Sequence, residues 1–551
     1  MPTSSTQTDD SSVMRLHATR DMRSQIPWSL RHRPRASYIA ILVFCVFYYS
    51  FSSGDSSPFY ARRSPYKIQA EFSREPAAGR ALRLQRRGQV EDAFKHAWKG
   101  YREYAWLHDE LMPVSGGKKD PFVGWAATLV DSLDALHIMG WKEEFAEALV
   151  ALEQIDFSKP NSDKVPVFEV TIRYLGGLLG AWDISGHRHP ILLQKARQLG
   201  DFLCQAFNTD NGLPVPYYLW KESTSAKLPG QDQVVLAQLA SLSMEFVRLS
   251  QVTGDPKYAA NIQLVTNELA NTQNSTGLPG MWPLTANCSG DGLSFQDNTF
   301  SLGALGDSAF EYLPKTHLLN YRVSNQYIEM YRNAFAAFSR KLFFRPLVPG
   351  NPDILMTGVI DMSSESPHVH GQFQHLACFV GGMVALGSRI SNSKEDLETA
   401  GKLTDGCVWG YNNTPSGIMP DFSQIEPCPP EGACVWAGEG SGYKKVDDPS
   451  YQLRPEAIES VFVMYRLTAD PSWLETGWKM FEAIEKHTRT GIAHARLVNV
   501  MEASPEHADS MESFWLGETL KYFYLLYSEP ELVSLDEFVF NTEAHPLRWR
   551  S

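Results

Sequence analysis

The chain has 551 residues, of which 43% are hydrophobic, 12% aromatic and 21% charged, and its formal net charge at pH 7 is −13. This composition is that of a globular protein with enough apolar residues for a large core. The acidic balance excludes nucleic acid as the expected partner, because phosphate binding needs a basic surface.

The N-terminal part predicts a membrane anchor. Residues 36–52 begin with the uncharged run ASYIAILVFCVFYYSF, and the basic run RHRPR precedes it at 31–35. The run is somewhat shorter than the roughly 20 residues that span a bilayer comfortably. Its positive flank places the N-terminus in the cytosol. We therefore expect a cytoplasmic tail at 1–35 and a signal-anchor transmembrane helix at 36–52; a cleaved signal peptide is the alternative.

A stem and a lumenal domain are expected to follow. Residues 53–89 are rich in Ser, Pro and Arg without periodicity, which predicts a flexible stem before a globular domain at 90–551. The secretory lumen is oxidising and permits disulfides. The pairing of Cys204, Cys288, Cys428 and Cys434 is left open. Sequons for N-glycosylation at Asn274, Asn287 and Asn412 fit the same compartment.

A helical hairpin recurs along the domain. Its best copies are LLGAWDISGHRHPILLQKARQLGDFL, LSMEFVRLSQVTGDPKYAANIQLVTNEL and VFVMYRLTADPSWLETGWKMFEAIEK. The first helix of each is predicted to end at Ser185-Gly186, Thr253-Gly254 or Thr468-Ala469, and a second helix opens with Asp or His and often Pro. Repeated hairpins stack into an open solenoid or a closed ring. Since the first helix of each pair is the more apolar, we predict a closed α/α toroid with small β-ribbons on its loops.

Carboxylates recur near the N-terminal ends of the apolar helices, where a buried charge is costly unless it is paired or functional. They are Asp131, Asp134, Glu169, Asp307, Glu311, Glu456, Glu459, Glu512 and Glu518. Each one alone is more simply a helix cap, a dipole partner or one half of an ion pair. In a ring of helices with one polarity, however, these ends meet at one rim and face a common cavity. Such a cavity suits hydrolysis of a polyhydroxylated substrate, with one carboxyl donating a proton and another activating water. The chain has no G-x-S-x-G motif, no His/Cys metal spacing and no Gly-rich phosphate loop.

Five motifs, in order, carry a resemblance to a known family. VFEVTIRYLGGLLGA, GDSAFEYL, LRPEAIES, MESFWLGETLKYFYLLY and FNTEAHP resemble the class I α-1,2-mannosidases, family 47 of the glycoside hydrolases, from about residue 90 to Pro546. The resemblance implies an all-α (α/α)7 barrel in a type II membrane protein of the endoplasmic reticulum or Golgi. It also implies a monomer that removes α-1,2-linked mannose from high-mannose N-glycans of glycoproteins, with inversion and with Ca2+ as cofactor.

By the same resemblance, roles are expected for individual residues. Glu169 resembles the general acid, acting through a water, and Asp307 resembles a third carboxylate that has also been considered for that role. Glu456 resembles the base that activates the attacking water, and Thr542 resembles the Ca2+ ligand. Cys378 and Cys407 match the disulfide of the family. The residues expected to bind substrate, directly or through metal-bound water, are Asp131, Arg173, Glu311, Arg454, Glu459, Phe514, Glu518, Glu543 and His545.

The C-terminal motif FNTEAHP is expected to plug the ring from the end opposite the substrate, with Val539 and Phe540 filling the bore. One departure from the family is Leu305, where endoplasmic-reticulum members carry Arg; Leu305 resembles Golgi-type members. Two alternatives to an active mannosidase remain. One is a mannose-glycan-binding quality-control relative with little turnover, and the other is an α/α-toroid hydrolase of another polysaccharide.

Overall fold

The computed structural model describes residues 65–221, 227–429 and 433–550. The predicted cytoplasmic tail and membrane anchor lie outside these residues. Within them, no helix is both long enough and apolar enough to cross a membrane.

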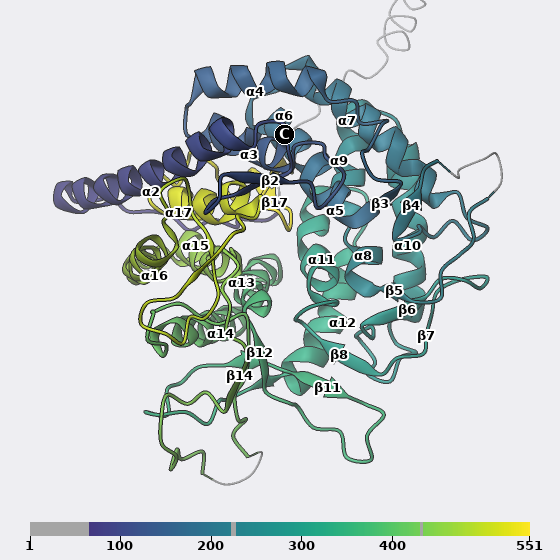
Figure 1. Ribbon diagram of the computed structural model, residues 1–551. Coiled ribbons are helices and arrows are strands. Elements are labelled where there is room, and N and C mark those ends of the chain that lie inside the picture. Colours follow the sequence, from purple (N-terminus) through teal and green to yellow (C-terminus); the bar gives the residue numbers. More distant parts are fainter. Residues whose placement is uncertain (1–64, 222–226, 430–432, 551) are drawn as a thin grey trace, which may run out of the picture. The chain divides into compact units, whose positions relative to one another are not determined.

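The described chain forms an inner and an outer layer of helices (Figure 1). The inner layer contains α3 (Ala127–Ile138), η1 (Val170–Leu175) continued by α6 (Gly176–Ile184), α8 (Leu236–Ala240) and α9 (Ser243–Thr253), α11 (Asp307–Asn320), α13 (Phe379–Ser391), α15 (Glu456–Thr468), and η4 (Trp515–Thr519) continued by α17 (Leu520–Leu526). The outer layer contains α2 (Ala77–Tyr104), α4 (Lys142–Gln154), α7 (Pro190–Leu203), α10 (Lys257–Thr272), α12 (Gln326–Lys341), α14 (Lys394–Asn412) and α16 (Ser472–Thr488). The short helix α5 (Val167–Glu169) leads into η1, whose hydrogen bonding is π-helical, as is that of η4.

The inner layer is a closed ring. Contacts run from α3 to α6, then to α9, α11, α13, α15 and α17, and η4 returns to α3. Each inner segment is paired with an outer helix, and α2, the first helix of the domain, covers α17, the last. The closed toroid predicted from the repeated hairpins is therefore confirmed.

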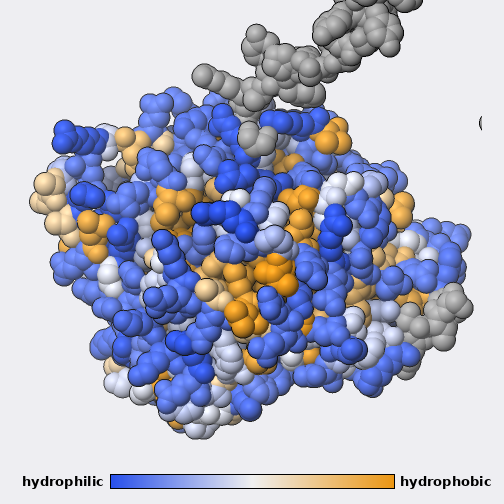
Figure 2. Space-filling view, turned by 90° about the horizontal axis from the view of Figure 1, so that it is seen from above, coloured by the Kyte–Doolittle hydropathy of each residue, from blue (hydrophilic) through white to orange (hydrophobic). Residues whose placement is uncertain are grey.

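Burial explains why the two layers differ in sequence. The inner helix α11 is buried on all sides, because it has ring neighbours, an outer helix and the bore around it. The outer helix α7 buries Leu192, Ala196, Leu199 and Leu203, which recur every three or four positions on one face. On the face shown in Figure 2 the surface is mostly hydrophilic, with a group of hydrophobic residues near its middle.

The predicted turns between inner and outer helices are also confirmed. Helix α9 ends at Thr253, and Gly254 follows with φ of 71°, in the left-handed region that glycine adopts without steric cost. Helix α15 ends at Thr468, and Ala469 takes the equivalent position with φ of 57°.

Small antiparallel ribbons occupy the loops, as expected. They pair β1 (Glu110–Met112) with β2 (Gly117–Lys119), β3 (Lys164–Pro166) with β4 (Tyr217–Leu219), β8 (Thr299–Ser301) with β11 (Val359–Asp361), β9 (Phe343–Phe344) with β10 (Met356–Thr357), β15 (Arg496–Leu497) with β16 (His507–Ala508), and β17 (Phe538–Phe540) with β18 (Pro546–Arg548). Two three-stranded sheets join β5 (Val234–Val235), β6 (Thr285–Asn287) and β7 (Ser294–Phe295), and β12 (Gln372–Gln374), β13 (Phe422–Gln424) and β14 (Lys445–Asp448).

The β17–β18 hairpin fills the bore. Phe538, Val539 and Phe540 are all at least 95% buried. The Phe540 ring packs edge-on against Phe462 of α15 and tilted against Tyr522 of α17. The prediction that the C-terminal segment plugs the ring is confirmed.

The N-terminal boundary of the domain differs from the prediction. Residues 65–89 belong to the compact unit, and α2 begins at Ala77 rather than near residue 90. Arg83 and Arg86, which suggested a solvated stem, lie on the inward face of α2. Arg83 donates to the carbonyl of Tyr527, and Arg86 forms an ion pair with Glu475 at 2.7 Å. The basic run resembles a linker in sequence because the partners of its arginines are distant along the chain.

The expected disulfide between Cys378 and Cys407 is present and ties the short helix η3 (His375–Cys378) to α14. Cys428 is bonded to Cys434, whereas Cys204 and Cys288 carry free thiols.

Candidate active site

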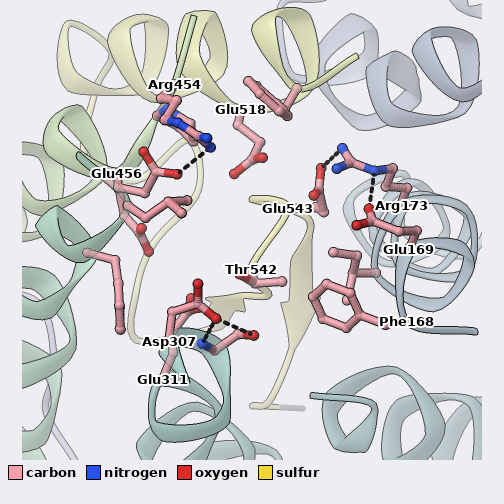
Figure 3. Close-up of a pocket in the computed structure, with 17 residues that line it drawn as sticks. Phe168, Glu169, Arg173, Asp307, Glu311, Arg454, Glu456, Glu518, Thr542 and Glu543 are labelled. Atoms are coloured by element: carbon pink, nitrogen blue, oxygen red, sulfur yellow. Dashed lines mark hydrogen bonds and ion pairs between the residues drawn. The ribbon is translucent and has the colours of Figure 1, made fainter. Parts of the chain in front are cut away.

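A cavity of about 210 Å³ opens at the N-terminal ends of the inner helices α11 and α15 (Figure 3). It is lined by Phe168, Glu169, Ile172, Arg173, Asp307, Ser308, Glu311, Leu376, Phe379, Arg454, Pro455, Glu456, Glu459, Phe514, Glu518, Thr542 and Glu543. The structure therefore gathers in one place acids that are spread over almost 400 positions of sequence. The predicted common cavity is confirmed for six of the nine carboxylates, whereas Asp131, Asp134 and Glu512 do not line it, and Glu512 pairs instead with Arg496 at 3.4 Å.

Glu456, the first residue of α15, is held ionised. His375 Nδ1 lies 2.8 Å from Glu456 Oε2, and Arg454 Nη1 lies 3.8 Å from Oε1. Burial alone would raise the pKa of this carboxyl, but the hydrogen bond from His375 and the charge of Arg454 lower it below the ordinary value of 4.5. The other ring nitrogen of His375 lies 2.8 Å from the hydroxyl of Tyr411, which fixes the orientation of the ring. An ionised, oriented carboxylate is what a general base requires.

Asp307, the first residue of α11, is in the opposite state. Burial, and then the negative charges of Glu311 and Glu456, raise its pKa to about 7. The backbone N–H of Ser308 donates to Asp307 Oδ1 at 2.8 Å and offsets only part of this effect. Asp307 is therefore suited to hold a proton near neutral pH.

Arg173 links two acids that line the cavity, Glu169 and Glu543. Its Nε donates to Glu169 Oε2 at 2.9 Å, and its Nη1 donates to Glu543 Oε2 at 2.8 Å. The guanidinium carbon lies 5.6 Å from the centre of the Phe514 ring. Figure 3 shows Glu169 and Glu456 on opposite sides of the cavity, with Thr542 and Glu543 between them.

A buried lysine, Lys315, neutralises part of the negative charge of the acids that line the cavity floor, around Thr542. Lys315 Nζ contacts Glu311 and lies 3.0 Å from Glu459 Oε1. Within the described residues no lysine or arginine forms an ion pair with Glu518, and burial, and then the charges of Glu543 and Glu456, raise its pKa well above the ordinary value. The floor thus carries more carboxylate than the protein itself neutralises.

Thr542 lies between these acids, in the turn that joins β17 to β18. Its hydroxyl and carbonyl oxygens and the surrounding carboxylates form an all-oxygen donor set, which is the kind that Ca2+ prefers. In the described part of the chain, no group of three or more His, Cys, Asp or Glu is arranged to hold a metal by itself. The residues fit a cation bound through Thr542 and through water held by the acids.

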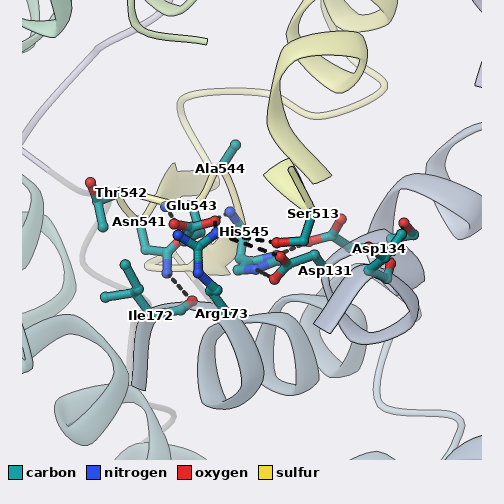
Figure 4. A network of polar contacts seen from close by, with 12 residues as sticks. Asp131, Asp134, Ile172, Arg173, Ser513, Asn541, Thr542, Glu543, Ala544 and His545 are labelled. Atoms are coloured by element: carbon teal, nitrogen blue, oxygen red, sulfur yellow. Dashed lines mark hydrogen bonds and ion pairs between the residues drawn. The ribbon is translucent and has the colours of Figure 1, made fainter. Parts of the chain in front are cut away.

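The turn that carries Thr542 is fixed by Asn541 (Figure 4). The Asn541 side-chain amide donates to the carbonyl of Ile172 at 3.0 Å and to Glu245 Oε1 at 2.7 Å. Its oxygen accepts from the backbone N–H groups of Glu543 and His545. All four hydrogen-bonding positions of the amide are used. Gly176 permits this approach, since a Cβ there would lie 2.6 Å from Asn541 Nδ2.

Asp131 and His545 do not reach the cavity, contrary to the prediction that they bind substrate. Both side chains are at most 1% exposed. His545 Nδ1 lies 2.7 Å from Asp134 Oδ2, and Lys521 Nζ lies 2.6 Å from Asp134 Oδ1. Asp131 and His545 lie near the site, but they support the Thr542 turn from behind (Figure 4).

Sequence reasoning missed four polar residues of the site. They are His375, Lys315, Glu245 and Asn541. His375, Glu245 and Asn541 each have a side-chain partner in another hairpin, which no local spacing marks. Lys315 had one available signal, because it follows Glu311 by four positions, on the same face of α11.

Comparison with known proteins gives one consistent result. Glycosyl hydrolase family 47 matches residues 93–549. Over 476 residues the chain is 36% identical to mannosyl-oligosaccharide 1,2-alpha-mannosidase MNS1 of Arabidopsis thaliana, covering 84% of this chain and 79% of the relative. It is 34% identical to human mannosyl-oligosaccharide 1,2-alpha-mannosidase IB, covering 84% and 70% of the two chains. The solved alpha-1,2-mannosidase from Trichoderma reesei superposes with a TM-score of 0.78 at 30% identity, covering 85% of this chain and 99% of that one.

Proposed function

The chain belongs to glycosyl hydrolase family 47, and on that basis we propose that it removes terminal α-1,2-linked mannose from high-mannose N-glycans of glycoproteins. The observation that carries this proposal is the joint presence of an ionised carboxylate, Glu456, and a protonatable one, Asp307, in a cavity that also contains Glu169. Opposed protonation states are what acid and base catalysis of glycoside hydrolysis require.

In the proposed reaction, Glu456 accepts a proton from the water that attacks the anomeric carbon. A carboxyl on the other side donates a proton to the leaving oxygen, and inversion follows from attack opposite the leaving group. Two residues compete for the acid role. Glu169 matches the family position but is paired with Arg173, and Asp307 has the raised pKa.

We propose that Thr542 is the protein ligand of a Ca2+ ion, with waters held by acids such as Glu518 and Glu543. A bound Ca2+ would supply positive charge at the floor and an oxygen-binding centre for sugar hydroxyls. The unneutralised carboxylates around Thr542 support this proposal.

The proposed location is the lumen of the endoplasmic reticulum or Golgi, with residues 36–52 as a single-pass type II anchor. The disulfide between Cys378 and Cys407 supports an oxidising compartment. In this view the protein meets newly glycosylated proteins as a monomer.

The test is to incubate the purified protein with a high-mannose N-glycan, with and without a calcium chelator, and to follow free mannose. We expect mannose release that stops with the chelator and returns with added Ca2+. A glycan-binding relative with little turnover would bind the glycan and release no mannose. Release in the chelator would reject the calcium role alone.

A further inference from the structure

A second cavity, of about 500 Å³, lies at the other ends of the inner helices. Asp307 begins α11 and lines the first cavity, whereas Leu319, near the end of the same helix, lines the second. At 1.5 Å per residue, this helix separates its ends by about 20 Å. The two cavities are therefore distinct sites.

The charged lining of this second cavity is entirely basic. His187 follows α6, Arg248 belongs to α9, Arg322 follows α11 and Arg548 belongs to β18; none of the described residues that line it is Asp or Glu. The charged lining of the first cavity, by contrast, consists mainly of carboxylates. Two arginines of the second cavity have carboxylate partners outside the lining, Asp183 for Arg248 and Glu537 for Arg548.

A buried acid organises this basic lining from behind. Asp183 is fully buried; its Oδ1 lies 2.6 Å from Arg248 Nη2 and 3.1 Å from His187 Nε2. Its Oδ2 accepts from Arg248 Nε and from the backbone N–H of Arg548, both at 2.7 Å. Burial raises the pKa of Asp183, but the hydrogen bonds from His187 and Arg248 lower it by more than burial raises it. The carboxyl is therefore ionised. One ionised acid thus fixes three lining groups without facing the cavity.

Two of the arginines keep donors for a ligand. Arg322 Nε donates to the hydroxyl of Tyr321 at 2.9 Å, and its guanidinium lies 5.5 Å from that ring. No carboxylate within the described residues pairs with Arg322. Among the described carboxylates Arg548 pairs with the exposed Glu537 alone, at 3.2 Å, and a surface pair of this kind is weak.

The remaining walls are partly apolar, from Val252, Leu319 and Trp549. The guanidinium fork matches the oxygens of a phosphate or a carboxylate. We propose that this second cavity binds an oxyanion, a phosphate ester or a carboxylate, carried on a partly apolar body. This proposal does not depend on the mannosidase activity proposed above.

The test is isothermal titration calorimetry of the full-length protein at fixed ionic strength with phenyl phosphate, benzoate and the neutral benzyl alcohol. We expect saturable binding of at least one of the two anions and none of benzyl alcohol. The tighter anion identifies the oxyanion. Loss of one charged hydrogen bond in Arg322→Gln should weaken binding about tenfold or more.

Arg340→Gln is the matched control, because Arg340 is an exposed arginine on α12 that does not line the cavity. It should leave binding unchanged, and Arg322→Gln should leave mannose release unchanged. The proposal is overturned if neither anion binds saturably, if benzyl alcohol binds as well, or if both arginine variants have the same effect.

Discussion

The side-chain amide of Asn541 donates to the carboxylate of Glu245 at 2.7 Å, and both residues are completely buried. Glu245 belongs to α9 and also accepts from the hydroxyl of Tyr312 in α11 at 2.8 Å. The inner helices α9 and α11 therefore hold the C-terminal turn in place by hydrogen bonds. The position of Thr542 depends on these hydrogen bonds, because Asn541 precedes it directly.

Asn541→Asp tests the hydrogen bond to Glu245 with almost no change in the shape of the side chain. The hydrogen bond that Asn541 donates to Glu245 would be replaced by repulsion between two carboxylates at the same distance. We therefore expect the free energy of unfolding to fall by about 3 kcal/mol. Urea denaturation measures the loss. Asn271→Asp, at an exposed position of α10, is the control and should have little effect. Equal stability of the two variants would show that Glu245 does not hold Asn541.

Glu456→Gln should separate binding from turnover. The amide keeps the size of the side chain but cannot take a proton from water, so mannose release should fall by roughly 10²–10⁴-fold. Glycan binding, measured by calorimetry, should be kept. Loss of both would indicate instead that Glu456 is a structural carboxylate.

Leaving-group chemistry can decide between the two candidate acids. An aryl α-mannoside with a good leaving group needs little protonation, so loss of the acid should slow it far less than it slows the natural glycan. We therefore expect one of the two variants, Glu169→Gln or Asp307→Asn, to keep much more of its activity on the aryl mannoside than on the natural glycan. A variant that is slowed equally on both substrates has lost another function.

The pH profile gives an independent check. An acid must be protonated, so if Asp307 is the acid, kcat/KM falls as pH rises through about 7. A base must be ionised, and the lowered pKa of Glu456 places the loss on the acid side below 4.5. Asp307→Asn should remove the alkaline limb. An unchanged alkaline limb in that variant would assign the limb to another group.

Thr542→Val tests the proposed Ca2+ ligand without relying on activity. A ligand that binds only the folded state raises Tm, by an amount that grows with the logarithm of its concentration relative to Kd. We expect Ca2+ to raise the Tm of the parent protein, and this rise to be lost in Thr542→Val. Thr399→Val, on the outer helix α14, should keep it. A retained rise in Thr542→Val would place the ion elsewhere.

The ring and its acidic rim could be predicted because both follow from local signals. The turns at Gly254 and Ala469 are marked by residues just past each helix end, and an acid at the start of an apolar helix, such as Glu456, is visible in the sequence alone. What failed depends on tertiary pairing. Arg83 is buried by Tyr527 and His545 is buried by Asp134, partners that are more than 400 positions away.

The closing of the bore by the C-terminal hairpin also orders events during synthesis. Glu543 lies 370 positions after its partner Arg173, so the ribosome adds Glu543 long after it has added Arg173. Until the hairpin enters the ring, Arg173 lacks that partner and the floor lacks Thr542. We therefore expect a growing chain, or one cut short before Asn541, to be inactive.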